Sequence, residues 1–460
     1  MILLIKITVN DLLDICGGKL INGNKNEKIN ECFVNSKENC FNVCFFGIKG
    51  KKVDGSLFYK EAFNNGARVC VLNKIKNIDL KGYEDRTIII VDDTINALQD
   101  LAKYKRSLFK GKVIAITGSV GKTSTKEIVS RVLTTNYKVL KTRENQNSQV
   151  GLPITILRLK DENVMVLEMG MNNFGQLHNL SLIAKPDISI ITNVYDSHIG
   201  NLGTRKNILK AKLEILDGMD EGILIINNDN YLLKEIDENI KENIKIMSVG
   251  IKNKSNIMAK NIVNNEVTTF DIDDLKSLKV VGGNSFIYNA LFAYLIGKLF
   301  GVSRGMIKKG INDTSTLNHR LELINLNNNI ILIDDCYNAS FDSVKAALEY
   351  IKIFKKRKIV ILGDILELGN ESKNIHTKIG KLVVSNDIEH LITIGKFSKF
   401  IDKEAIRLGM KKNKIKHFDN ETESREYIKN IIKENDVILL KGSNGMNLIN
   451  LVNYLKEGLV

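Results

Sequence analysis

Val113-Ile-Ala-Ile-Thr-Gly-Ser-Val-Gly-Lys-Thr-Ser-Thr-Lys126 reads as a buried strand, a glycine-containing loop and the start of a helix. In such a loop the backbone N–H groups face a polyphosphate, while Lys122 reaches the terminal phosphates and Thr123 can ligate Mg²⁺. The form is the shorter Gly-x-x-Gly-Lys-Thr, since Ile116 stands where the strict pattern has its first glycine. The pattern predicts an ATP site at Gly118, Ser119, Val120, Gly121, Lys122, Thr123 and Ser124.

Short apolar runs alternate with amphipathic stretches from about residue 113 onward, which is typical of βα units around a parallel sheet. After Ser340 and Asp342, either of which can cap a helix, apolar residues recur at i, i+3, i+4 and i+7 from Val344 to Ile351. We therefore predict a helix there, with strands at Val113–Thr117, Val164–Met169, Ile188–Thr192, Ile223–Ile226, Ile330–Asp334, Lys358–Leu362, Leu391–Gly395 and Val437–Leu440.

Residues 1–92 lack this rhythm and combine short strands with many Gly and Asn turns, which favours a separate domain. Ile95–Phe109 predicts a helix leading into a second domain, and the polar stretch Thr314–Asn318 indicates a second break. A chain of 460 residues suits about three domains. The predicted fold class is α/β with three domains: a small α/β N-terminal domain (1–92), a central P-loop ATPase-like parallel-sheet domain (93–316) and a C-terminal Rossmann-like domain (317–460).

The composition is that of a soluble globular protein, with 43% hydrophobic and 26% charged residues. No apolar stretch reaches the ~18 residues of a membrane span, and Lys6 interrupts the opening apolar run too early for a signal peptide. The six cysteines form no CxxC pair, so we expect a reducing cytosol and neither a disulfide framework nor a zinc site. The net charge of +14 is spread along the chain, which favours a biased composition over a nucleic-acid partner.

Several polar side chains follow predicted strands, at the sheet edge where open α/β folds bind ligands. Glu168 could hold Mg²⁺ or order its water, although a solvated strand end is an equally good interpretation. His198 follows the next strand, where a lone histidine is more often structural, and Lys212 lies on a predicted helix, where a solvated lysine is the ordinary expectation. Asp334 and Asp335 suit ribose or phosphate–metal contacts, with helix capping as an even alternative.

A polar loop, Asn145, Asn147 and Ser148, precedes Gly151-Leu-Pro153. Its side chains and backbone could line a substrate groove, although loops of this composition are usually turns.

Taken in order, these segments resemble the Mur ligases of peptidoglycan synthesis over nearly the whole chain. The Asp-x-Tyr-Asn-Ala and Leu-Gly-Asp…Glu-Leu-Gly…His forms are similar to the branch that adds D-alanyl-D-alanine. The Asp-Tyr-Ala-His and Asp-Asn-Pro-Arg motifs of the branch that adds the third stem-peptide residue are absent from the sequence. The likeness is carried by Asn35-Ser-Lys37, Phe46-Gly-Ile-Lys-Gly50, Asp54-Gly55, Gly118 to Ser124, Asn145-Gln-Asn147, Gly151-Leu-Pro153, Glu168-Met-Gly170, His198, Ala211-Lys-Leu-Glu214, Asn289, Arg320, Asp335-Cys-Tyr-Asn-Ala339, Gly363-Asp364, Glu367-Leu-Gly369, His376, Lys441-Gly-Ser443 and Gly445-Met446.

The resemblance implies a role for each matching residue. Lys122 would bind ATP phosphates, Thr123, Glu168 and His198 would serve Mg²⁺, and Lys212 matches a lysine that is carbamylated in the family and helps hold a second Mg²⁺. The implied catalytic residues are Lys122, His198, Lys212 and Asn338. The implied nucleotide contacts outside the loop are Asn289, Arg320 and Asp335. The implied substrate contacts are Ser36, Asn145, Asn147, Tyr337, Gly363 and Asp364.

The same likeness implies an activity that uses ATP and Mg²⁺. The carboxylate of UDP-N-acetylmuramoyl-tripeptide would become an acyl phosphate, which the amine of D-Ala-D-Ala would attack. The implied enzyme is a cytoplasmic monomer with small-molecule substrates and neither a nucleic-acid nor a membrane partner. The sequence departs from the family pattern at Tyr195-Asp-Ser197, Ser285-Phe286, Ser340-Phe341 and Asn444, which leaves a divergent Mur-type amide ligase with another amine substrate as the alternative.

Overall fold

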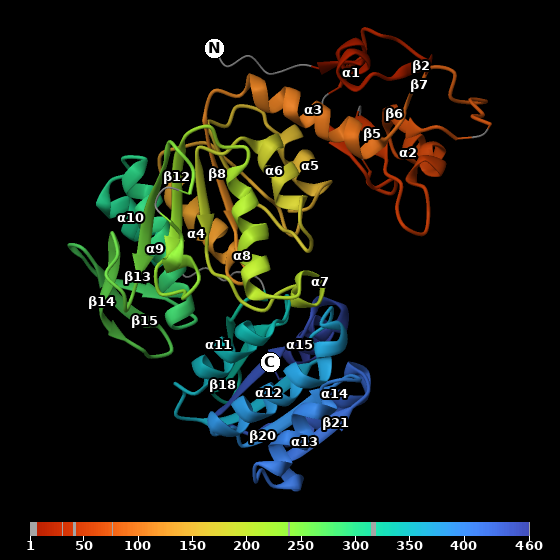
Figure 1. The fold of residues 1–460 in the computed structure, drawn as a ribbon. Helices are drawn as coiled ribbons and strands as arrows, with labels where there is room; N and C mark the ends of the chain where they lie inside the picture. The colour runs from red at the N-terminus through yellow and green to blue at the C-terminus, as the bar shows by residue number, and fades with distance from the viewer. Residues whose placement is uncertain are drawn as a thin grey trace.

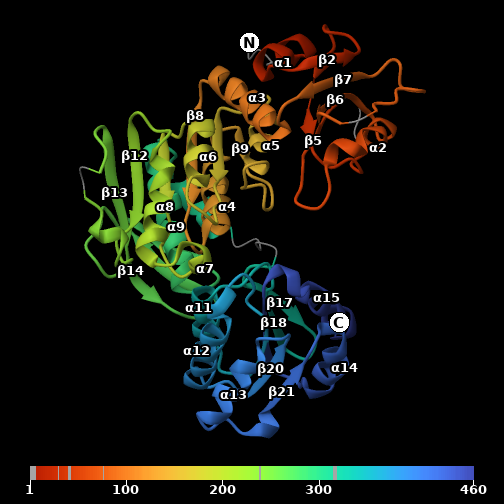
Figure 2. The same ribbon diagram turned by 45° about the vertical axis from the view of Figure 1, so that its right-hand side comes forward.

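The computed structural model describes residues 7–29, 31–39, 43–75, 77–237, 240–313 and 319–459. These residues form three bodies, each built on its own large sheet, which follow one another from the top of Figure 1 to its foot. In the turned view of Figure 2 the third body again lies below the central one, with helix α11 (Phe341–Ile351) on the side that faces the central sheet. The predicted break at 314–318 lies outside the described residues, so that domain boundary stays a prediction.

The N-terminal body is a five-stranded sheet in the order β2-β7-β6-β5-β4. Strand β2 runs antiparallel to β7 and the other neighbours are parallel. A two-stranded sheet of β1 and β3 lies beside it. The bounds are β1 (Ile7–Thr8), α1 (Val9–Cys16), β2 (Lys19–Asn22), β3 (Lys28–Ile29), β4 (Cys32–Phe33), β5 (Val43–Gly47), α2 (Tyr59–Asn64), β6 (Ala67–Asn73) and β7 (Thr87–Val91).

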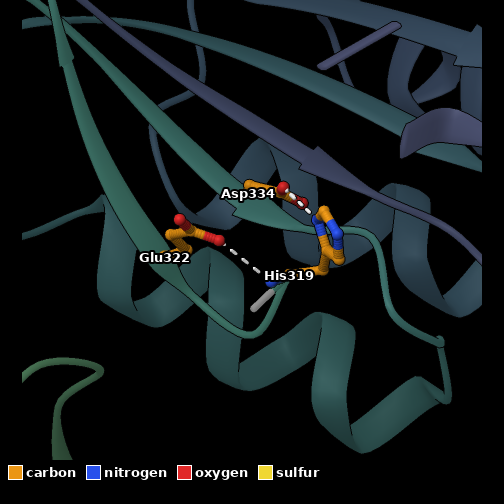
Figure 3. Close-up of side chains that lie close together, drawn as sticks. All are labelled: His319, Glu322 and Asp334. Atoms are coloured by element: carbon orange, nitrogen blue, oxygen red, sulfur yellow. Dashed lines mark hydrogen bonds and ion pairs between the residues drawn. The ribbon is translucent and has the colours of Figure 1, made fainter. Parts of the chain in front are cut away.

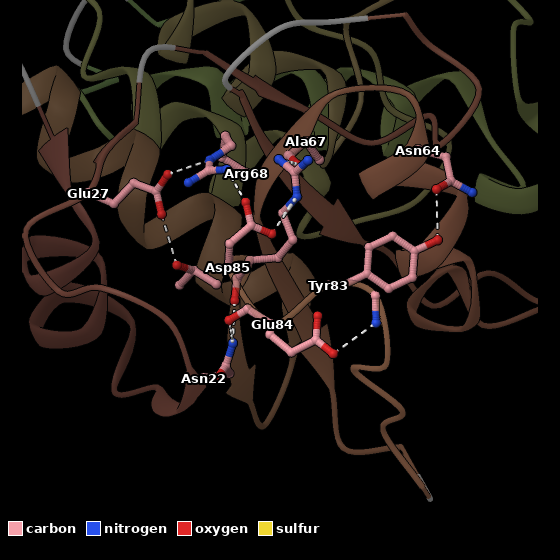
Figure 4. Close-up of polar contacts among 11 residues, drawn as sticks. Asn22, Glu27, Asn64, Ala67, Arg68, Tyr83, Glu84 and Asp85 are labelled. Atoms are coloured by element: carbon pink, nitrogen blue, oxygen red, sulfur yellow. Dashed lines mark hydrogen bonds and ion pairs between the residues drawn. The ribbon is translucent and has the colours of Figure 1, made fainter.

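A polar network fixes the loop that enters β7 (Figure 4). Arg68 on β6 donates from Nε to Glu27 at 2.9 Å and from Nη1 to Asp85 at 2.7 Å. Asn22 on β2 donates to the Arg86 carbonyl at 2.6 Å, and the Tyr83 hydroxyl donates to Asn64. The Asp85 side chain is 64% exposed, so its ion pair with Arg68 contributes little to stability, and the network as a whole holds the loop in register.

The central body is a nine-stranded sheet in the order β16-β15-β14-β13-β12-β11-β8-β10-β9. The strands from β9 to β14 are parallel, and β14, β15 and β16 form an antiparallel extension. The strands are β8 (Lys112–Thr117), β9 (Val139–Lys141), β10 (Val164–Glu168), β11 (Ile188–Ile191), β12 (Gly222–Asn227), β13 (Ile244–Gly250), β14 (Ile257–Val263), β15 (Thr268–Ile272) and β16 (Leu275–Val280).

Helices cover both faces of the central sheet, so its middle strands are apolar at successive positions. On β10, Met165 and Leu167 join the core under α3, α5, α6 and α8, while Val164 and Val166 join the core under α4, α9 and α10. The helices are α3 (Thr94–Leu108), α4 (Lys122–Leu133), α5 (Gly151–Leu157), α6 (Gln176–Ala184), α7 (Ile199–Leu202), α8 (Arg205–Leu213), α9 (Asn284–Leu299) and α10 (Arg304–Asn312).

The third body is a six-stranded sheet in the order β17-β18-β22-β19-β20-β21, parallel except for β17. Helices α11, α12 and α13 cover one face, and α14 and α15 cover the other. The bounds are β17 (Glu322–Leu326), β18 (Ile330–Asp335), β19 (Arg357–Gly363), α12 (Ser372–Ser385), β20 (His390–Ile394), α13 (Lys399–Arg407), β21 (Ile415–Phe418), α14 (Glu421–Ile431), β22 (Asp436–Lys441) and α15 (Leu448–Leu459).

The predicted α/β fold class is confirmed, and every predicted strand occurs within two residues of its predicted bounds. The predicted helices also occur, and Ser340 caps α11 by accepting the Ser343 N–H. The sequence did not predict β9, β13, β17, β21 or the antiparallel extension β14 to β16. In that extension apolar residues alternate with exposed lysines, as in Leu275–Val280, because only one side of it packs against the core.

Candidate functional site

The loop after β8 has the backbone shape of a phosphate cradle. Gly118 and Gly121 have φ values of 150° and 85°, which side-chain-bearing residues rarely adopt. A Cβ atom on Gly118 would also lie 1.9 Å from Thr192 Oγ1, so this position requires glycine. Asn193 secures the loop, because its carbonyl accepts the Ser119 N–H at 3.1 Å and its Oδ1 accepts the Val120 N–H at 2.9 Å.

Lys122 folds back over this loop. Its Nζ donates to the Gly118 carbonyl at 2.9 Å, which is its one hydrogen bond to a residue that the structure describes. Burial lowers the pKa of Lys122, and the nearby Glu168 carboxylate opposes that shift. If a phosphate group bound in the loop, the Lys122 ammonium could exchange its hydrogen bond to the Gly118 carbonyl for a stronger, charge-assisted bond to the phosphate.

Glu168 lies at the carboxyl end of β10 and is 2% exposed. It accepts hydrogen bonds from the Thr123 hydroxyl at 2.8 Å and from the Asn147 amide at 2.8 Å. The Thr123 hydroxyl in turn accepts a hydrogen bond from Arg320 at 2.8 Å. A carboxylate and a hydroxyl side by side are hard oxygen ligands, so these residues fit a magnesium ion next to the phosphates.

His198 and Lys212 lie close enough to Lys122 for its charge to act on both, and burial lowers the pKa of each. Burial, followed by the charges of Lys122 and Lys212, lowers the pKa of His198 to about 4, so its imidazole is neutral and can ligate a metal at neutral pH. Burial lowers the pKa of Lys212 well below its usual range, and Lys122 adds to the effect. Lys212 is 2% exposed and makes no side-chain hydrogen bond within the described part of the chain.

The third domain reaches this site with Arg320. Its guanidinium stacks 3.8 Å from the centre of the Tyr337 ring while it donates to Thr123. A second contact between the domains joins Glu367, which has φ 64°, to His198, with Oε2 4.0 Å from Nδ1. The structure thus brings residues of two sheets to one place.

Asp335 and Asn338 surround Lys441 at the edge of the third-domain sheet. Lys441 Nζ donates to Asp335 Oδ2 at 2.5 Å and to the Asn338 carbonyl at 3.0 Å. Burial raises the pKa of Asp335, and Lys441 opposes that shift. The Asn338 residue is exposed, and its Oδ1 accepts the Ala339 N–H at 2.9 Å.

Asn289 on α9 supports the loop from the opposite side. Its Oδ1 accepts the Thr125 hydroxyl at 3.0 Å, and a Cβ atom on Gly121 would lie 3.2 Å from it. The predicted base contact therefore lies directly against the loop.

The remaining predicted site residues either lie away from the phosphate loop or form hydrogen bonds with backbone groups. Ser36 is in the N-terminal domain, where its hydroxyl donates to Glu61 and its carbonyl accepts the Asn65 amide. Asn145 is exposed beside Asn147. Gly363 allows the close approach of Gly442, and the Asp364 carboxylate accepts the backbone N–H groups of Phe397 and Ser398. Asp364 thus shapes the turn after β20, and its predicted role in substrate binding stays a prediction.

The sequence reasoning gave no role to Asn193, Lys441 or His319. The Lys441-Gly-Ser443 segment was part of the resemblance, but nothing in the sequence tied its lysine to Asp335. Asn193 directly follows the predicted strand Ile188–Thr192, so its position at the ligand edge was the available signal.

The loop, its lysine and the adjacent carboxylate define a P-loop nucleotide-binding protein whose site is completed by a second α/β domain. Two family models match the chain: the Mur ligase middle domain at residues 116–297 and the Mur ligase glutamate ligase domain at residues 319–444. The chain belongs to the Mur ligase family.

Named relatives and solved structures match nearly the full length. The UDP-N-acetylmuramoyl-tripeptide–D-alanyl-D-alanine ligases of Bacillus subtilis (strain 168) and Escherichia coli (strain K12) are 32% and 30% identical, and each match covers 99% of both chains. A crystal structure of MurF from Acinetobacter baumannii superposes with a TM-score of 0.87 at 28% identity over 99% of both chains. The MurF ligase of Thermotoga maritima in complex with ADP gives a TM-score of 0.79 at 26% identity, over 93% of this chain and 97% of that one.

Within the described ranges, no helix combines the length and the apolar character that crossing a membrane requires.

Proposed function

We propose that this chain is the ATP-dependent ligase that adds D-alanyl-D-alanine to UDP-N-acetylmuramoyl-tripeptide in peptidoglycan precursor synthesis. The observation that carries the proposal is the contact between Arg320 of the third domain and Thr123 of the phosphate loop, because it joins two domains into one site. Full-length relatives named for this reaction support the same assignment.

The site residues account for the first chemical step. Lys122 and the loop N–H groups neutralise charge on the γ-phosphoryl group while the tripeptide carboxylate attacks its phosphorus atom. The bond between that phosphorus and the oxygen of ADP breaks, and an acyl phosphate forms. The uncharged amine of the dipeptide then attacks the acyl carbon. A C–N bond forms, phosphate leaves, and the amine releases a proton.

Magnesium would supply positive charge to the phosphate oxygens during this transfer. Thr123 and Glu168 offer oxygen ligands, and His198 offers a neutral imidazole. The lowered pKa of the buried Lys212 amine favours its uncharged form, which is the form that adds CO₂ to give a carbamate and a proton. The resulting anion would replace an unpaired amine with a ligand for a second magnesium ion.

The third domain protects the acyl phosphate from water. Arg320 and Glu367 both reach across to the central domain, and they contact Thr123 and His198 on the loop edge. Closure of this kind excludes water from a reactive intermediate. Tyr337 and Asn338 lie on the same edge and would receive the dipeptide.

We place the enzyme in the cytoplasm as a monomer. The described cysteines, Cys16, Cys32, Cys44, Cys70 and Cys336, carry free thiols, which supports a reducing compartment. Size-exclusion chromatography with light scattering tests the monomer.

The test of the proposed reaction is the product mass from a panel of amines. Purified enzyme receives ATP, Mg²⁺, UDP-N-acetylmuramoyl-tripeptide and one amine at a time: D-Ala-D-Ala, L-Ala-L-Ala, D-alanine, lysine or glutamate. We expect product with D-Ala-D-Ala, heavier than the nucleotide substrate by the dipeptide less one water. Strong activity with glutamate and none with the dipeptide would replace the proposal with the alternative, another amide ligase on the same scaffold.

A further inference from the structure

The turn that carries Arg320 has an unusual backbone. His319 and Leu321, on either side of Arg320, have φ values of 60° and 48°, in the left-handed region that favours glycine. Side-chain-bearing residues stay in this region when surrounding contacts hold them there. Two such residues flank the arginine that crosses to the phosphate loop, so the contacts that hold them determine where Arg320 points.

Two adjacent aspartates at the end of β18 provide these contacts. Asp334 is fully buried, and it accepts a hydrogen bond from His319 Nδ1 at 2.6 Å and another from the Cys336 N–H at 3.1 Å. Asp335 accepts the Leu321 N–H at 3.3 Å. Successive residues of a strand point to opposite faces, so the two carboxylates hold the two flanks of Arg320 separately.

His319 also positions the ring on which Arg320 stacks. Its carbonyl accepts the Tyr337 N–H at 3.1 Å, and its own N–H donates to Glu322 at 3.1 Å. Figure 3 shows the imidazole beside the Asp334 carboxylate of β18, and the Glu322 carboxylate of β17 beside the backbone nitrogen of His319. One residue therefore fixes both members of the Arg320–Tyr337 stack.

We propose that His319, locked by Asp334, is the positioning residue that holds Arg320 against Thr123 and Tyr337. His319 acts through its neighbour and does not itself touch the nucleotide. The inference rests on the proposed function to the extent that Arg320 contacts the nucleotide there.

A metal site is the competing explanation for the same residues. Ligand atoms of His319, Glu322 and Asp334 lie within 4.8 Å of one another. Their hydrogen bonds account for the cluster without an ion, because Asp334 is occupied by His319 and Cys336 while Glu322 is occupied by a backbone N–H. Metal analysis of the purified protein separates the two: zinc at one ion per chain in the wild type, lost in His319→Ala, would overturn the positioning role.

The decisive experiment is a double-mutant cycle on ADP binding, measured by calorimetry with Mg²⁺. The variants are His319→Ala, Arg320→Ala and the double variant. We expect each single change to weaken ADP binding about tenfold, and the double variant to bind no more weakly than Arg320→Ala. Equal binding by His319→Ala and wild type, or an additive loss of about a hundredfold in the double variant, would overturn the inference.

Two further variants separate positioning from general damage. His319→Asn tolerates a positive φ and keeps an N–H donor, so we expect it to retain most of the affinity and to raise the KM for ATP more than it lowers kcat. His417→Ala is the matched control, since His417 lies 3.6 Å from Asp402 at the far edge of the same sheet. It should bind ADP as the wild type does. A wild-type protein that binds no ADP would instead overturn the proposed function.

Discussion

The carboxyl edges of the central and third-domain sheets both carry ionisable side chains with shifted pKa values, but the two edges differ in how these side chains are paired. At the central edge, Lys212 has no hydrogen-bonding partner and Lys122 has only a carbonyl of its own loop, within the described residues. At the third-domain edge, Asp335 is paired with Lys441, and Asp334 with His319. Buried charges without partners are costly, so they persist where a ligand supplies the partner.

This difference in pairing indicates that the central edge carries the chemistry and that the third-domain edge positions Arg320. At the central edge the Glu168 carboxylate near Lys122 already accepts two hydrogen bonds, and under the proposed function the phosphates of a nucleotide would supply further negative charge. The third-domain edge is already satisfied, and its charges hold Arg320 and the turn that carries it. We therefore expect substitutions at the central edge to change catalysis directly, substitutions in the Asp335–Lys441 pair to change stability, and substitutions in the Asp334–His319 pair to act through the position of Arg320.

The largest expected effect is at Lys122. Lys122→Ala should lower kcat by about a thousandfold, because the charge that develops on the γ-phosphoryl group loses its ammonium. The rate of phosphate release at saturating substrate concentrations gives kcat for each variant. Lys138→Ala is the control, since Lys138 is an exposed lysine of the same domain that pairs with Asp161. A loss in Lys122→Ala of less than tenfold would remove Lys122 from the chemistry.

The pair at the third-domain edge should respond through stability. Lys441→Met leaves Asp335 buried without its cation, and we expect a loss of about 3–5 kcal/mol in local stability. Hydrogen exchange in peptides of β18 and β22 measures this free energy. The double variant Lys441→Met/Asp335→Asn should recover most of the lost free energy, because no unpaired buried charge remains. No restoration in the double variant would show that Lys441 stabilises the edge by another route.

Variants of Lys212 test whether a carboxylate-like anion is needed at this position of the central sheet edge. Lys212→Ala should lower kcat about a hundredfold, and added acetate or formate should restore part of the activity by occupying the vacated space with a carboxylate. Lys212→Met is the matched control, because its side chain fills the space and should prevent rescue. Equal rescue of both variants would contradict a carbamate at this position.

Asp342 differs from Asp334 and Asp335 because it lacks an ion-pair partner among the described residues, and its substitution should have the smallest effect of those considered. Its Oδ2 is buried without a hydrogen bond, and burial, followed by Asp196, raises its pKa to about 6. The folded protein thus holds this proton more tightly than the unfolded chain does. As pH rises from about 4 to about 6, stability should fall, and it should stay at the lower value above that range.

Asp342→Asn should remove this dependence. The variant should melt at a higher temperature than the wild type at pH 8, and the difference should shrink at pH 4, as thermal unfolding scans would show. A difference that grows toward low pH would contradict burial as the cause of the shift.

Much of the fold was predictable from the sequence, because strands buried on both faces are continuous apolar runs. The run from Val164 to Leu167 and the glycines of the phosphate loop belong to this class of signal. Lys122, Thr123 and Glu168 were predictable as neighbours since each follows a strand or begins a helix at the same sheet edge. In the structure the Thr123 hydroxyl donates to Glu168 at 2.8 Å, so these two residues are neighbours.

The partners across domains were not predictable from local sequence. The Thr123–Arg320 bond joins residues from two domains, and a polar contact of that kind leaves no periodicity. His319 also escaped notice, because its role depends on a left-handed backbone and on an aspartate that it meets only in the folded sheet. Lys212 has no local signal, and its burial shows only in the structure.

The fate of the carboxylate oxygen shows whether the reaction passes through an acyl phosphate. UDP-N-acetylmuramoyl-tripeptide labelled with ¹⁸O in the reacting carboxylate would be converted with ATP and D-Ala-D-Ala, and the released phosphate analysed by mass spectrometry. Attack of that carboxylate on the γ-phosphorus predicts one ¹⁸O in every phosphate released. Phosphate without label, alongside normal amide product, would contradict the account.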